Sequence, residues 1–195
     1  MDTATFTAFL TYALVMAITP GPNNILTLSC VGRHGLRGSS RLIWGVSGGF
    51  VVVMLLSGLF SLTLSRALPA VMPWLVWLGA GYILWLAWHI AVAGTPEEGG
   101  AASPPRFAAG FLLQFINVKV WLCGLTALSS FVLPQTTETL PVVGYSLALA
   151  FIGAGCNLIW GLAGDLLRGA FLRWGRRLNV ALGLSLAYCG LRMVV

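Results

Sequence analysis

The sequence predicts an all-α integral membrane protein with six transmembrane helices, arranged as two inverted halves of three helices each. Of its 195 residues, 58% are hydrophobic and only 8% are charged, whereas an ordinary soluble domain has roughly 25% charged residues. Six apolar runs are long enough to cross a bilayer. Arginines gather in alternate loops between these runs, as expected when successive spans cross in opposite directions.

The predicted spans occupy most of the chain, so we expect a single transmembrane domain, residues 1–195. The six spans are 4–30, 41–65, 70–93, 107–132, 141–164 and 178–195. Each has about 18 or more residues nearly free of charge, enough for a helix to cross a hydrocarbon layer of roughly 30 Å. The first run follows Asp2 and has no basic leader, which favours a retained span over a secretory signal.

The segment 94–106 is the only one rich in proline, glycine and acidic residues, and it divides the chain into halves 1–93 and 107–195. Each half has an odd number of spans. Two similar halves would therefore cross the membrane in opposite directions, as in transporters built from inverted repeats.

The distribution of arginines predicts the orientation. The first, third and fifth loops contain Arg33, Arg37, Arg41, Arg106, Arg168, Arg173, Arg176 and Arg177, whereas the second and fourth contain only Arg66. The positive-inside rule places the odd loops in the cytoplasm and both termini in the periplasm of a bacterial inner membrane. Lipid head groups then account for the net charge of +6, and we expect no nucleic-acid partner.

The first span is interrupted by TPGPNN at 19–24. Pro20 and Pro22 lack an amide donor and Gly21 adds backbone freedom, so the helix must stop or kink. Within a membrane such a break is tolerated only where protein buries it or where it lines a wet cavity. A helix that restarts there presents free amides and a partial positive charge, which suits a carboxylate. We predict that the substrate site includes Thr19, Pro20, Gly21, Pro22, Asn23 and Asn24; a simple proline kink is the alternative.

The fourth span contains a second interruption, Asn117 and Lys119. A lysine at the membrane midplane costs roughly 2.5 to 3.5 kcal/mol, and no acidic residue lies in the central part of any span. Carbonyls freed at the two breaks, Asn117 itself or a ligand carboxylate could compensate the charge. Interrupted spans at corresponding positions of inverted halves mark a transporter site. We therefore assign both residues to the substrate site, with a lysine satisfied by carbonyls alone as the alternative.

Three further polar residues are weaker candidates. Asn157 in the fifth span either contacts the ligand or joins two helices by a hydrogen bond. Asp165 and His89 lie near the cytoplasmic ends of the fifth and third spans, where they either take part in proton transfer or face the head groups. The glycine pair Gly45 and Gly49 in the second span predicts close helix packing.

The sequence predicts no cofactor, no metal site and no catalytic residues. Four cysteines are scattered singly through the spans, without a CxxC pair: Cys30, Cys123, Cys156 and Cys189. This argues against a disulfide framework, a thiolate metal site or a thiol oxidoreductase. There is no nucleotide-binding P-loop, so transport must be driven by an ion gradient or by the substrate gradient.

TPGPN at 19–23 is similar to the opening motif of the lysine exporter superfamily, small six-span bacterial efflux proteins that include the homoserine and threonine resistance branch. The similarity continues through RHGLRG at 33–38 and RLNVALG at 177–183. Residues 113–136 resemble the branch that exports cysteine and O-acetylserine. The resemblance thus covers essentially the whole chain.

This resemblance implies a secondary transporter, not an enzyme, that exports cysteine and O-acetylserine by proton antiport. Homoserine, threonine or another neutral amino acid is the alternative cargo, and a metal ion is a more remote one. The resemblance assigns substrate contact to 20–24, Asn117 and Lys119. Many members have Asn-Pro-Lys where this chain has Asn117-Val118-Lys119, so we expect a milder second break. Small-residue faces would permit a homodimer.

For a zwitterionic amino acid, we expect Asn23 and Asn24 at the restarted helix, together with Lys119, to hold the carboxylate. Carbonyls freed around 19–21 and Asn157 would hold the ammonium. Alternating access would then be a rocking of the first three spans against the last three about this site.

Overall fold

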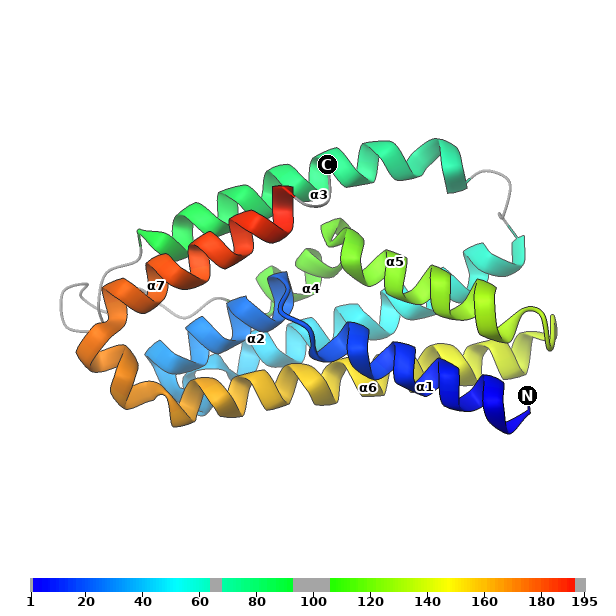
Figure 1. The fold of residues 1–195 in the computed structure, drawn as a ribbon, viewed down its shortest axis with the longest axis horizontal. Coiled ribbons are helices and arrows are strands. Elements are labelled where there is room, and N and C mark those ends of the chain that lie inside the picture. Colours follow the sequence, from blue (N-terminus) through cyan, green and yellow to red (C-terminus); the bar gives the residue numbers. More distant parts are fainter. Residues whose placement is uncertain (1, 64–67, 93–105, 192–195) are drawn as a thin grey trace.

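The computed structural model describes residues 2–63, 68–92 and 106–191, and every regular element in these ranges is helical (Figure 1). The elements are α1 (Thr3–Ile18), α2 (Pro22–Thr63), α3 (Leu68–Ala91), α4 (Phe107–Ile116), α5 (Val118–Ala127), the π-helical turn η1 (Leu128–Val132), α6 (Thr139–Leu166) and α7 (Arg168–Leu191). The all-α prediction is confirmed for these residues. Apart from Arg106, the predicted linker 94–106 lies outside the described residues.

The first predicted span corresponds to two helices in series. α1 ends at Ile18 and α2 begins at Pro22, so the chain breaks within TPGPNN, where the prolines and glycine predicted a break. In Figure 1, the first leg of α2, 22–34, continues in the general direction of α1. The second leg, 36–63, returns the opposite way.

The predicted loop between 30 and 41 is instead a hairpin within α2. Its two legs meet at Gly35, which has φ 73° and ψ 168°. Glycine reaches positive φ without the steric penalty of a Cβ atom, so the reversal needs only this one non-helical residue. The expectation of a longer loop was wrong for this reason.

The second break separates α4 from α5 at Asn117, whose backbone is extended with φ −84° and ψ 92°. The two helices are bent by 59°, so the break is pronounced although no proline is present. The indole N–H of Trp121 donates to the carbonyl of Phe115, just before the bend, at 2.9 Å. A side-chain donor thus satisfies a carbonyl that the interrupted helix leaves free.

Glycines let the helices approach one another closely. A Cβ atom on Gly45 would overlap the backbone carbonyl of Phe107, and one on Gly49 would lie 2.6 Å from the carbonyl of Phe111. The close packing predicted for this glycine pair is therefore present, between α2 and α4. Small residues at crossings of this kind are typical of helices packed within membranes.

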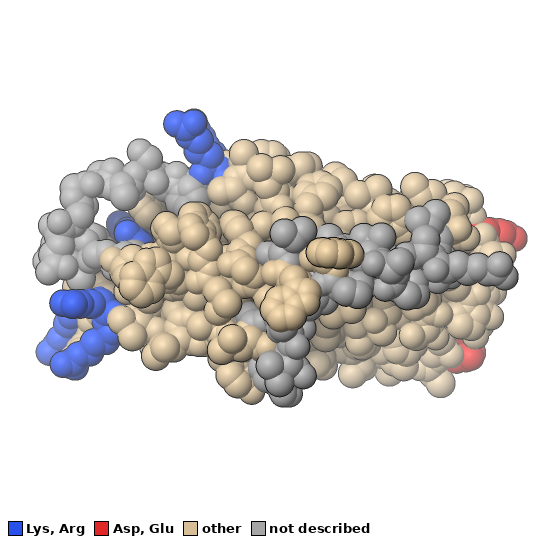
Figure 2. All heavy atoms as spheres, turned by 90° about the horizontal axis from the view of Figure 1, so that it is seen from above, with Lys and Arg blue, Asp and Glu red and all other residues tan. Residues whose placement is uncertain are grey.

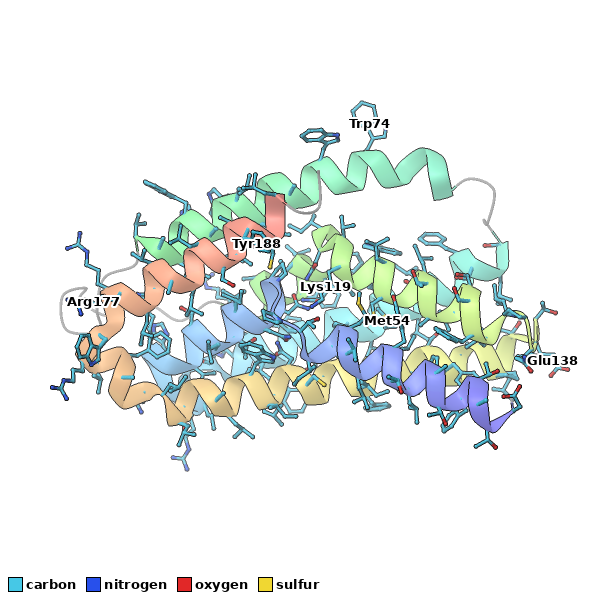
Figure 3. The ribbon with its side chains drawn as sticks, viewed as in Figure 1. Met54, Trp74, Lys119, Glu138, Arg177 and Tyr188 are labelled. Atoms are coloured by element: carbon cyan, nitrogen blue, oxygen red, sulfur yellow. The ribbon has the colours of Figure 1, made fainter. Side chains whose placement is uncertain are left out.

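Length and apolarity favour a membrane protein. Among the described residues, α2 and α6 are long and apolar enough to cross a membrane, and α4 with its continuation to Val132 forms a third span if the bent pair counts as one. α1 and Ala80–Ala91 are shorter apolar helices. In Figure 2, Lys and Arg gather at one end of the molecule and the visible acidic residues lie at the other. Figure 3 labels Arg177 and Glu138 at these two ends.

Candidate functional site

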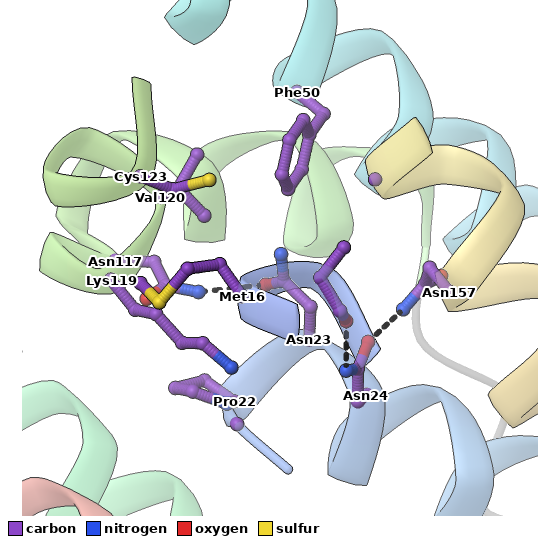
Figure 4. A pocket seen from close by; sticks show the side chains of 13 residues that line it. Met16, Pro22, Asn23, Asn24, Phe50, Asn117, Lys119, Val120, Cys123 and Asn157 are labelled. Carbon is purple, nitrogen blue, oxygen red and sulfur yellow. Dashed lines mark hydrogen bonds between the residues drawn. The ribbon is translucent and has the colours of Figure 1, made fainter. Parts of the chain in front are cut away.

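A small cavity lies where the two helix breaks meet (Figure 4). Its volume is about 30 Å³, enough for roughly two water molecules and far too little for a free amino acid. Its lining is Met16, Ala17, Gly21, Pro22, Asn23, Asn24, Phe50, Asn117, Lys119, Val120, Cys123, Gly153 and Asn157. Two larger hollows, one along α1 and one between α2 and α6, are mostly apolar.

Three buried amides join the first break to the second. Asn23 and Gln114 exchange two hydrogen bonds: Asn23 Nδ2 donates to Gln114 Oε1 at 2.7 Å, and Gln114 Nε2 donates to Asn23 Oδ1 at 3.1 Å. Asn117 Nδ2 also donates to Asn23 Oδ1, at 3.0 Å. We call these three residues the amide cluster. Sequence reasoning missed Gln114, although a fully buried glutamine within an apolar span is itself a functional signal.

A second polar group connects α1, α2 and α6. Asn24 Nδ2 donates to the carbonyls of Ala17 and Thr19, at 2.8 and 2.9 Å. Asn157 Nδ2 donates to Asn24 Oδ1 at 3.3 Å, and its own Oδ1 accepts from the Thr27 hydroxyl at 3.1 Å. Asn157 therefore joins two helices, one of its two predicted roles, and also lines the cavity.

Lys119 reaches from α5 to the end of α1. Its Nζ donates to the Thr19 carbonyl at 2.8 Å, to the Thr19 hydroxyl at 2.9 Å and to the Pro20 carbonyl at 3.4 Å. These are the freed carbonyls that we expected to receive the substrate ammonium. In this structure they hold the lysine ammonium, which was the alternative left open for Lys119.

Side chains from α6 and from the C-cap of α1 itself donate to further carbonyls in the last turn of α1. The Trp160 indole N–H donates to the Ile18 carbonyl at 3.0 Å, and the Thr19 hydroxyl donates to the Met16 carbonyl at 3.0 Å. The final four carbonyls of a helix have no partner within it. No sequence pattern predicts that Trp160 supplies a donor here, because tryptophans near span ends usually face the membrane interface.

Two kinds of polar group remain available to a ligand. Asn117 Oδ1 is buried and has no hydrogen-bond partner, which costs about 1 to 3 kcal/mol unless a donor arrives. The first backbone hydrogen bond at the start of α2 runs from Ile25 N to Gly21 O at 2.9 Å. The backbone amides of Asn23 and Asn24 precede this bond, so they form the free N-terminus of the helix.

The predicted residues do not all meet at the cavity. Thr19 and Pro20 do not line it; Thr19 is bonded to two lining residues, Lys119 and Asn24, and Pro20 to Lys119. Asp165 and His89 are exposed and do not line it. His89 instead lies against Trp85, with its Nδ1 2.9 Å from the Trp85 carbonyl and ring centroids 3.9 Å apart.

The apolar side of the cavity was not predicted. It is formed by Met16, Phe50, Val120 and Cys123. Apolar residues in an apolar span carry no signal that separates a cavity wall from a packed core. Within residues 2–63, 68–92 and 106–191, no three His, Cys, Asp or Glu side chains are grouped to hold a metal ion.

Comparisons with known proteins identify the family of the chain. Residues 14–195 match the family described as LysE type translocator. The chain is 50% identical over 193 residues to the cysteine/O-acetylserine efflux proteins of Escherichia coli (strain K12) and Shigella sonnei (strain Ss046), covering 99% of both chains in each case. It is 52% identical over 186 residues to the protein of the same name from Shigella flexneri, covering 95% of each. No solved structure matches it significantly.

Proposed function

Because the chain belongs to the LysE type translocator family, and is therefore a transporter rather than an enzyme, we propose that it exports cysteine and O-acetylserine from the cytoplasm. The observation that carries this proposal is a cavity partly lined by asparagines and Lys119 at the junction of two interrupted helices, in a chain half identical to cysteine/O-acetylserine efflux proteins along nearly its full length. Homoserine or threonine has the same carboxylate and α-ammonium, which the same protein groups would bind, and is the alternative cargo.

The proposed architecture is six spans in two inverted halves. In Figure 1, α1 and the first leg of α2 run in the opposite direction to α4 and α5, and the second leg of α2 runs opposite to α6. α3 likewise runs opposite to α7. Helices at equivalent places in two inverted repeats must be antiparallel, so these directions support the arrangement.

In the proposed orientation, the arginine-rich end faces the cytoplasm and the termini lie in the periplasm. Arg177 lies over the Trp174 ring, with its guanidinium carbon 4.9 Å from the ring centroid, a pairing suited to the head-group region. At the opposite end, Asp2 accepts the Thr5 backbone N–H at 2.7 Å, which lowers the pKa of the Asp2 carboxyl and keeps it charged.

Cysteine labelling tests this orientation. Thr137 and Gly169 are exposed at opposite ends of α6, which spans Thr139–Leu166, and both lie just outside it. In a chain whose native cysteines are replaced by serine, a membrane-impermeant maleimide applied to spheroplasts should label Thr137→Cys and leave Gly169→Cys unlabelled until the membrane is opened. The reverse pattern would contradict the orientation.

We assign the substrate carboxylate to the start of α2, where the Asn23 and Asn24 amides and the positive end of the helix point. The cavity is too small for the substrate, so binding must widen it, and rocking of the two halves would open it to each side in turn. A proton gradient is the proposed energy source. Asp165 and His89 do not line the cavity, so either would have to act on the cytoplasmic side of the site rather than at it.

The function is tested by efflux of radiolabelled O-acetylserine and cysteine from proteoliposomes, with and without a pH gradient. We expect wild-type efflux that the gradient accelerates, and loss of efflux in Asn23→Ala, because this change removes the centre of the amide cluster. Ser47→Ala is the matched control, since the Ser47 hydroxyl bonds only to the Ile43 carbonyl of its own helix. Absence of wild-type efflux for both compounds would refute the substrate assignment.

A further inference from the structure

We propose that the oxygens at the end of α1 form an ammonium subsite, which Lys119 occupies in the substrate-free protein and which the α-ammonium of the substrate takes over during transport. This inference rests on the proposed function and deepens it. It assigns Lys119 a second position, facing the substrate carboxylate, and makes the lysine a tethered competitor for the site.

The geometry around Lys119 matches the chemistry of a primary ammonium. An ammonium has three N–H donors, and Lys119 Nζ meets three oxygens: the carbonyl and hydroxyl of Thr19 and the carbonyl of Pro20. The carbonyl end of a helix also carries a partial negative charge, which favours a cation. A free α-ammonium presents the same three donors, so these oxygens would bind it in the same way.

The charge around Lys119 is balanced by a helix end rather than by an acid. The chain has five acidic residues, at 2, 97, 98, 138 and 165, and none lies in the central part of a predicted span. The end of α1 offers only about half an elementary charge. A lysine held in this way is replaceable, because its alternative partner, a substrate carboxylate, carries a full negative charge.

A zwitterionic amino acid can be inserted between Lys119 and the carbonyl end of α1 without leaving a charge unpaired. Its ammonium would face the end of α1, and its carboxylate would face Lys119 and the start of α2. Negative and positive groups then alternate from α1 through the substrate to α5. No proton is transferred in this exchange, and the only bonds that change are hydrogen bonds.

The surroundings allow Lys119 to move. Its side chain is half-buried and lies against Gly21, where an added Cβ atom would be 3.0 Å from Nζ and 3.1 Å from Cδ. The cavity begins beside it and is also lined by Asn117, whose buried Oδ1 lacks a partner. When Nζ leaves Thr19, this amide oxygen can serve as a further acceptor for the incoming ammonium.

The first test uses small ammonium ions as probes of the emptied subsite. In Lys119→Ala the three oxygens lose the lysine donor, and only the Thr19 carbonyl keeps another, Asn24 Nδ2 at 2.9 Å. Methylammonium should therefore bind there and raise the Tm of the detergent-purified variant, because a ligand that binds the folded state stabilises it. Tetramethylammonium has no N–H donor and should not. Wild type, whose subsite is filled, should respond to neither. Equal responses of the variant to both ions, or none, would overturn the inference.

The second test uses wild type and does not depend on the variant folding. Lys119 is the only lysine in the chain, so labelling with [ζ-15N]lysine gives a single side-chain NMR signal. O-acetylserine should move this signal. Its isomer N-acetylserine keeps the carboxylate but has no ammonium, so it should leave the signal in place. Identical spectra with both compounds would contradict the exchange.

Failure of this inference is distinguishable from failure of the proposed function. Wild-type efflux with no methylammonium effect and no isomer-dependent signal would support the proposed export function and refute the exchange of Lys119 for the substrate ammonium. A methylammonium effect on Lys119→Ala without efflux of either compound would support the ammonium subsite and refute the cargo.

Discussion

The amide cluster of Asn23, Gln114 and Asn117 makes a quantitative prediction about stability. Replacing Asn23 by Ala removes three hydrogen bonds at once. Gln114 Oε1 and Asn117 Nδ2 are then left without partners, whereas Gln114 Nε2 keeps the Gly110 carbonyl at 2.9 Å. Both remaining side chains are almost fully buried, so water cannot easily replace the lost partner.

Two sets of hydrogen-bond energies bound the expected loss of stability. An unpaired buried polar group costs about 1 to 3 kcal/mol in water-soluble proteins, which gives about 2 to 6 kcal/mol for two groups. Hydrogen bonds between membrane helices average only about 0.6 kcal/mol, with a maximum near 1.7, which gives about 2 to 5 kcal/mol for three bonds. The two ranges overlap, and we expect Asn23→Ala to lower the free energy of unfolding by about 2 to 4 kcal/mol.

A double-mutant cycle measures the interaction energy between Asn23 and Gln114. Gln114→Leu keeps most of the side-chain volume and should cost about 1 to 3 kcal/mol, because it leaves Asn23 Nδ2 unpaired. In Asn23→Ala/Gln114→Leu neither partner remains to be left unpaired, so the double variant should fall short of the sum by about 1 to 2 kcal/mol.

Equilibrium unfolding by SDS titration in mixed micelles, followed by circular dichroism, measures these values. Ser47→Ala is the control, with an expected change under about 0.5 kcal/mol. Additivity of the two single changes within about 0.3 kcal/mol would refute the reasoning, because it would mean that the two side chains do not interact in the folded protein.

Three further predictions concern packing and the end of α1. Gly153→Ala places a Cβ atom 2.5 Å from the Phe50 ring, so the ring must move into the cavity; we expect a loss of stability of about 1 to 3 kcal/mol and weaker O-acetylserine efflux in proteoliposomes. Gly45→Ala overlaps the backbone of α4 and should cost at least as much stability in the same SDS titration. Trp160→Phe removes the donor to Ile18 and should cost only about 0.5 to 1.5 kcal/mol; a loss above that of Asn23→Ala would contradict the weight given to the amide cluster.

The two helix breaks could be predicted from the sequence because their chemistry is local. Pro20 and Pro22 cannot continue a helix wherever they lie, and Lys119 is anomalous in an apolar span regardless of its partners. The partner of Lys119 depended on how α1 and α5 cross, which no local pattern specifies. For that reason freed carbonyls, Asn117 and a ligand carboxylate all stayed open as partners of the lysine, and the structure shows it at the Thr19 oxygens.

Other features were beyond sequence reasoning for a different reason. Gly35 stands in a polar stretch that suited an ordinary loop, and only its positive φ reveals a one-residue reversal. Gln114 is visible as a polar residue in an apolar span, but it does not interrupt helical periodicity. Its role depends on the two hydrogen bonds that it exchanges with Asn23, 91 residues earlier, which no local pattern specifies.

The one-residue joint at Gly35 limits how the protein can move. A long loop can extend and so lets two helices separate, whereas a single residue between two helical legs cannot extend. α6 and α7 have two such joints, Leu167 between them and the non-helical Trp174, with φ −128° and ψ 19°, within α7. At the arginine-rich end, the two legs of α2 must therefore move together as one unit. A passage can open there only beside this unit, and inserting glycines next to Gly35 would weaken the transmission of motion from that end to the cavity.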